Sequence, residues 1–74
     1  MAIIELDLRF LQPPEPFERT ADALDRIGPG DELLVLIHRE PRPLFQMLRS
    51  SGYRYGVETA DDGCFRIRIT PAGR

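Results

Sequence analysis

The stretch "DELLVLIHREPRPLF", residues 31–45, decides the fold predicted for this chain of 74 residues. Its first half contains the unbroken apolar run "LLVLI". A strand that is apolar on both faces belongs in the centre of a sheet, with a neighbour on each side. Its second half contains Pro41 and Pro43, and proline is tolerated in the first turn of a helix because its missing N–H has no partner there. The stretch therefore predicts a central strand at 31–38, followed by a helix at 41–51.

The residues before this stretch have the same arrangement. The segment "IIELDL", residues 3–8, alternates apolar and acidic residues, as a half-buried strand does. The segment "LQPPEPF", residues 11–17, repeats the Pro-x-Pro pattern, and we expect Pro14 and Pro16 in the first turn of another helix. The spacing predicts that the apolar face of this helix consists of Phe17, Ala21, Leu24 and Ile27. The sequence "GPG" at 28–30 is expected to end it.

Two further alternating segments follow the second helix. The segment "YRYGVET" (53–59) places two tyrosines and a valine on one face, and "CFRIRIT" (64–70) places Phe65, Ile67 and Ile69 inward. The sequence "DDG" between them predicts a turn. The outward positions of the predicted strands are nearly all charged: Glu5, Asp7, Arg54, Glu58, Arg66 and Arg68. Such a face is left to solvent, so both helices must cover the other face of the sheet.

These elements predict an α+β fold, a two-layer α/β sandwich with the order β-α-β-α-β-β. Its mixed four-stranded sheet carries both helices on one face. We expect a single domain over residues 1–70 and a flexible C-terminal tail over 71–74.

Composition excludes several classes of function. The net charge of −2 gives no long-range attraction for nucleic acid or an anionic membrane. A single cysteine cannot form an internal disulfide, so nothing argues for export. The N-terminus lacks the basic start and apolar run of a signal peptide, and no stretch approaches the roughly 20 apolar residues that span a bilayer. We expect a cytoplasmic monomer without a metal ion or another cofactor.

The predicted fold brings charged residues to one edge of the sheet. The carboxyl ends of the first two strands meet there, as do the N-termini of both helices, and open α/β sheets bind ligands at this edge. The residues that we expect to form a ligand or partner site are Arg9, Pro13, Pro14, His38, Arg39 and Arg42. The arginines would neutralise a small anion or an anionic group of a protein partner, and His38 would add a switchable donor. The alternative is a rim of ion pairs between these arginines and nearby acidic residues.

Two other sites remain as alternatives. Cys64 follows the predicted turn and lies on the polar face, where Arg66 would lower the pKa of its thiol. The chain would then be a sulfur-transfer protein that uses Cys64. Arg54, Arg66 and Arg68 form a basic stripe on the open sheet face, which would suit RNA. The aromatic residues of these strands point inward, however, and cross-strand ion pairing is the better interpretation.

The segment "LDLRFLQPPEP", residues 6–16, resembles the L-D-x-R-G-L-x-C-P-x-P signature of the TusA/SirA sulfur-carrier family. The residues that match are Leu6, Asp7, Arg9, Leu11, Pro14 and Pro16. The order of elements also matches that family over nearly the whole chain. The resemblance implies the carrier fold, but Phe10 replaces the glycine of the signature and Pro13 stands where the family has its sulfur-accepting cysteine.

Because proline cannot carry sulfur, we expect a non-catalytic binding or adaptor domain, and not an enzyme. The segments "IHREPRPL" (37–44) and "GYRYGVE" (52–58) resemble a cysteine-lacking branch of TusA-related domains. Members of this branch occur alone or beside hemerythrin-like domains. The resemblance therefore implies a link to redox or nitrogen-oxide metabolism.

Overall fold

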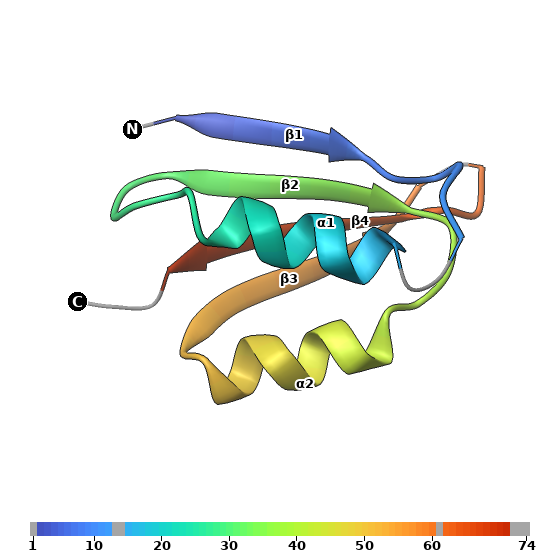
Figure 1. Ribbon diagram of the computed structural model, residues 1–74. Helices are drawn as coiled ribbons and strands as arrows, with labels where there is room; N and C mark the ends of the chain where they lie inside the picture. Colours follow the sequence, from blue (N-terminus) through green and yellow to red (C-terminus); the bar gives the residue numbers. More distant parts are fainter. Residues whose placement is uncertain (1, 13–14, 61, 72–74) are drawn as a thin grey trace.

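The computed structural model of the chain describes residues 2–12, 15–60 and 62–71. Its elements are β1 (Ile3–Asp7), α1 (Glu15–Leu24), β2 (Glu32–Ile37), α2 (Arg42–Ser50), β3 (Tyr53–Thr59) and β4 (Phe65–Pro71). The strands form one sheet in the order β1-β2-β4-β3, in which β1 and β2 are parallel and β4 is antiparallel to both of its neighbours. Both helices cover the same face of this sheet (Figure 1). The predicted two-layer α+β sandwich is confirmed.

The central position of β2 explains why its sequence is apolar throughout. Leu33 and Val35 are fully buried beneath the helices, while Leu34 and Leu36 are half-buried on the open face. The register places inward-facing residues of neighbouring strands side by side, for example Val35 of β2 beside Leu6 of β1 and Ile67 of β4. The buried core consists of Leu8, Leu24, Leu33, Val35, Ile37, Leu44, Leu48, Ile67 and Ile69. Both predicted strands of the C-terminal hairpin also have the expected bounds to within one residue.

The predicted apolar face of α1 is wrong in its first turn. Pro16, Thr20 and Leu24 are buried, whereas the side chain of Phe17 is 37% exposed. A threonine enters the core at little cost because its hydroxyl donates to the carbonyl oxygen of Pro16 at 2.8 Å. Phe17 is thereby left on the flank of the helix.

The predicted end of α1 is also wrong, because the helix ends at Leu24 and Ile27 lies beyond it. The amide of Arg26 donates to the carbonyl oxygen of Ala23 at 3.0 Å, which tightens the chain into a turn. The amide of Gly28 donates to Oδ2 of Asp31 at 2.9 Å. The turn at Arg26 ends the helix before Gly28, and the bond from Gly28 to Asp31 belongs to the connection to β2.

The second helix agrees with its prediction more closely. Pro41 occupies the N-cap of α2, Pro43 lies in its first turn, and Gly52 follows its end with a φ of 82°. That left-handed conformation favours glycine at the end of a helix. Pro14, expected in the first turn of α1, lies outside the described residues.

The C-terminal boundary differs slightly from the prediction. β4 runs to Pro71, one residue beyond the predicted boundary, and residues 72–74 of the predicted tail lie outside the described residues. Neither described helix is long and apolar enough to cross a membrane.

Candidate functional site

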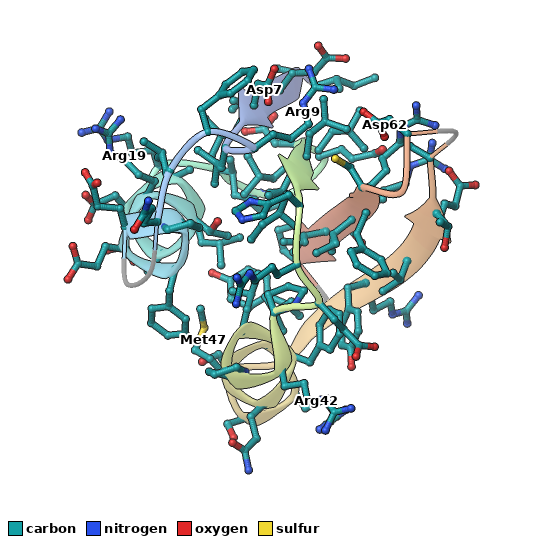
Figure 2. The ribbon with its side chains drawn as sticks, turned by 90° about the vertical axis from the view of Figure 1, so that its right-hand side faces the viewer. Asp7, Arg9, Arg19, Arg42, Met47 and Asp62 are labelled. Carbon is teal, nitrogen blue, oxygen red and sulfur yellow. The ribbon has the colours of Figure 1, made fainter. Side chains whose placement is uncertain are left out.

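An apolar groove lies where β2 ends and both helices begin. Its volume is about 410 Å³. The groove, which we call the edge groove, is lined by Pro16, Phe17, Ile37, His38, Arg39, Glu40, Pro41, Pro43 and Leu44. Figure 2 views the molecule from this end, with α1 to the left of the end of β2 and α2 below it. Two separate segments of the chain, one at residues 16–17 and one within 37–44, therefore build one cavity at the edge where the sequence predicts a site.

The two Pro-x-Pro segments make this cavity apolar. Pro16 and Pro43 lie in the first turns of α1 and α2, where other residues would present N–H groups. Proline has no such donor, so each helix begins with an apolar ring. Ile37 and Leu44 are buried and close the groove toward the core. The result suits an apolar group better than the bare small anion that the sequence suggests.

The rim of the edge groove carries charge on one side. His38, Arg39 and Glu40 are all exposed there. Oε1 of Glu40 lies 3.4 Å from Nε of Arg42, so this carboxylate already has a partner. Among the described residues, no carboxylate forms an ion pair with Arg39. The groove therefore keeps a positive charge at this side.

Arg9 belongs to a different cluster. Its Nη2 and Nε donate to the two carboxylate oxygens of Asp7 at 2.7 and 2.8 Å, and its Nη1 donates to Oδ2 of Asp62 at 3.2 Å. We call these three residues the arginine clasp, which fastens the segment after β1 to the turn between β3 and β4. The hydrogen bond from Arg9 lowers the pKa of Asp7, and Asp7 raises the pKa of Arg9.

The structure thus divides the predicted site. His38 and Arg39 line the edge groove, and Arg42 stands beside it, paired with Glu40. Figure 2 shows the arginine clasp at the β1 side of the molecule and Arg42 on the outer side of α2, far from Arg9. Pro13 and Pro14 lie outside the described residues. The four described residues do not converge on one anion, and the rim of ion pairs accounts for Arg9 and Arg42.

Sequence reasoning missed the walls of the edge groove. It assigned Phe17 to the core and gave Pro16 and Pro43 only the role of starting helices. The signal was present in the parallel Pro-x-Pro segments, because two apolar helix starts at one sheet edge must face each other across the end of the intervening strand.

Metal ligation at this edge has no support in the described part of the chain. Within residues 2–12, 15–60 and 62–71, no three His, Cys, Asp or Glu side chains lie close enough together to hold a metal ion.

Cys64 is half-buried beside the arginine clasp, and its surroundings do not activate it. Burial raises the pKa of the thiol, and so do the hydrogen bond to Asp62 and its negative charge; Arg9 opposes them only in part. The expectation that Arg66 lowers the pKa of Cys64 is therefore wrong. Arg66 instead forms an ion pair with Glu58, in which Nη1 of Arg66 lies 3.5 Å from Oε1 of Glu58.

This environment predicts slow alkylation of Cys64. Because only the thiolate reacts, we expect the iodoacetamide rate to reach its midpoint above the pH of about 8.5 typical of a free cysteine. Asp62→Asn removes a negative charge that raises the pKa, so the midpoint should move to lower pH. Intact-mass spectrometry across pH 7 to 11 measures both curves, with Cys64→Ser as the unreactive control. A midpoint at or below 8.5 in the wild-type chain would contradict this description.

The open sheet face carries ion pairs. Nε of Arg68 lies 2.7 Å from Oε2 of Glu32 on the neighbouring strand, and Arg66 pairs with Glu58 on the other side. The interpretation as cross-strand pairing is confirmed for these two arginines. Each guanidinium is partly neutralised, which argues against a surface for nucleic acid.

The fold and the motif together define a protein of the SirA/TusA class. The crystal structure of a SirA-like protein from Desulfitobacterium hafniense matches this chain with a TM-score of 0.81 and 25% sequence identity, covering 99% of this chain and 100% of that chain. A family model described as "Uncharacterized conserved protein (DUF2249)" matches residues 5–71. The chain belongs to this DUF2249 family, and its fold is SirA-like. A search of the curated proteins found no match.

Proposed function

We propose that this chain is a non-catalytic binding module, derived from the sulfur-carrier fold, that holds an apolar group in the edge groove. The observation that carries the proposal is the groove itself. Its volume of about 410 Å³ falls within the roughly 300–1,000 Å³ of ligand sites, which are lined mainly by apolar side chains with a few polar groups. Six of its nine lining residues are Pro, Phe, Ile or Leu.

Two features support a binding role over sulfur transfer. Position 13 is a proline, which has no nucleophilic atom, and the pKa of Cys64 is raised. Cys64 also lies outside the edge groove. Incubation with a persulfide donor should add no sulfur to the chain. A gain in intact mass that disappears in Cys64→Ser would overturn the non-catalytic assignment. The link to redox or nitrogen-oxide metabolism stays a prediction from the resemblance.

A titration with the neutral probe 3-phenylpropanol tests the proposed site. We expect saturable ¹H–¹⁵N shifts at the amides of Phe17, Ile37, His38 and Leu44, and none at Arg66 or Arg68. Phe17→Ser removes one wall of the groove and should weaken binding about three- to tenfold, because the probe loses aromatic contact and apolar burial.

Phe10→Ser is the matched control. Phe10 is 85% exposed and does not line the edge groove, so its loss should leave the affinity for the probe unchanged. Equal effects of the two serine variants, or the absence of saturable shifts around the groove, would refute the proposed site.

A further inference from the structure

The distribution of charge around the edge groove indicates what occupies it. Glu40 is paired with Arg42. On α1, Oε2 of Glu15 lies 3.9 Å from Nη2 of Arg19, one helical turn away. The remaining charged side chain in the lining is Arg39, for which the described residues supply no carboxylate. An occupant with a carboxylate near Arg39 would complete the pattern of pairs at this rim.

The N-terminus of α2 carries a partial positive charge, which has the same sign as the charge of Arg39. The first turn of this helix contains no acidic residue, and among the described residues no side chain caps its N-terminus. By contrast, α1 carries Glu15 and Glu18 in its first turn, which compensate the partial positive charge of a helix start. Glu40 precedes this helix and pairs with Arg42, so the charge at this side of the groove for which the described residues supply no carboxylate is the guanidinium of Arg39.

The shape of the site favours a protein segment over a free small molecule. Five of the nine lining residues are exposed (Phe17, His38, Arg39, Glu40 and Pro43), so the groove lies open at the surface, whereas small-molecule sites bury about 70–90% of their ligand. In addition, Phe10 stands 85% exposed on the segment after β1, at the same end of the sheet. A partner that docks at this end has an exposed aromatic residue available beyond the groove.

We infer that the edge groove binds a segment of a partner protein that presents an aliphatic or aromatic side chain beside a carboxylate. The apolar side chain enters the groove between Phe17 and the prolines. The carboxylate pairs with Arg39 and faces the start of α2. This inference rests on the proposed function and specifies the chemistry of the partner.

Three short peptides test the two halves of the inference. The probes are acetyl-Gly-Glu-Phe-Gly-amide, its Gln-Phe analogue and its Glu-Ala analogue, titrated at low salt and followed by ¹H–¹⁵N shifts of the groove amides. We expect the Glu-Phe peptide to bind best and the Gln-Phe peptide about threefold more weakly, as suits an exposed ion pair. The Glu-Ala peptide should not saturate. In 0.5 M NaCl, the Glu/Gln difference should shrink because salt screens exposed charges.

Arg39→Gln identifies the residue responsible. In this variant the Glu-Phe and Gln-Phe peptides should bind equally, at the affinity of the Gln-Phe peptide for the wild-type chain. Arg19→Gln is the matched control, because Arg19 lies on α1, points away from the molecule in Figure 2 and does not line the groove. It should keep the threefold preference.

The outcomes separate this inference from the function on which it rests. Equal binding of the Glu-Phe and Gln-Phe peptides to the wild-type chain would overturn the inferred pairing of a partner carboxylate with Arg39. The proposed binding of an apolar group in the groove would stand. If 3-phenylpropionate binds as tightly as the Glu-Phe peptide, the inference that the occupant is a protein segment would be overturned in favour of a small acid. If neither the peptides nor 3-phenylpropanol shifts the groove amides, the proposed function falls together with the inference.

Discussion

Replacing Ile67 by alanine should lower the free energy of unfolding by about 2–5 kcal/mol, the range for a large aliphatic residue truncated inside a core. Ile67 is fully buried in β4, and the register places it between Val35 and Val57 on the inner face of the sheet. Native domains have only about 0.05–0.15 kcal/mol of stability per residue, so a chain of 74 residues would lose a large share of its total. Urea denaturation followed by circular dichroism measures the loss.

Two milder changes calibrate this result. Ile67→Val removes one methylene group and should cost about 0.5–1.5 kcal/mol. Val57→Ala alters the adjacent residue of β3, whose side chain is 41% exposed, and should cost less than the alanine change at Ile67. If Val57→Ala were the more damaging of the two, the assignment of the inner sheet face would be in error.

Phe45→Ala should lower the free energy of unfolding by about 2–4 kcal/mol, near the lower part of the range for buried aromatic residues because Phe45 is half-buried. The ring of Phe45 stacks on Tyr55, with ring centroids 4.9 Å apart and an interplanar angle of 6°. Nη1 of Arg49 also donates to the hydroxyl of Tyr55 at 2.9 Å. Two residues of α2 thus hold one residue of β3 across the short turn between these elements.

A double-mutant cycle isolates the stacking contribution. Phe45→Ala, Tyr55→Ala and the double variant, compared by urea denaturation, should give a coupling free energy of about 0.5–1.5 kcal/mol. Tyr55→Phe keeps the ring and removes the bond from Arg49, so it should retain most of this coupling. Additive losses in the double variant would show that the two rings stabilise the chain independently.

The fold could be predicted because its strands carry unambiguous patterns. The run from Leu33 to Ile37 placed β2 in the centre, and the alternation around Ile67 fixed the buried face of β4. The phase of α1 could not be predicted from hydrophobicity, because the residue that enters the core is Thr20. Its hydroxyl is satisfied by a carbonyl one turn earlier, a bond that appears only once the helix has formed.

The edge at which His38 and Arg39 lie could be predicted from the sequence, and the apolar groove at that edge could not. The pattern of parallel strands and proline-started helices placed His38 and Arg39 at the carboxyl edge of the first two strands, where both line the groove. The pairing of Arg9 with Asp62 joins residues 53 positions apart, and no local pattern reveals such a contact. The prediction of an anion site rested on the number of charged residues at this edge. The structure shows that most of these charges pair with each other and that the cavity is apolar.

The arrangement of the strand ends has a practical consequence for handling the protein. β1 begins and β4 ends at the same end of the sheet, opposite the edge groove (Figure 1). A tag, a surface tether or a fused domain joined before β1 or after β4 therefore leaves the sheet at the end opposite the groove. Immobilisation through either of these points therefore keeps the attachment and the edge groove at opposite ends of the sheet.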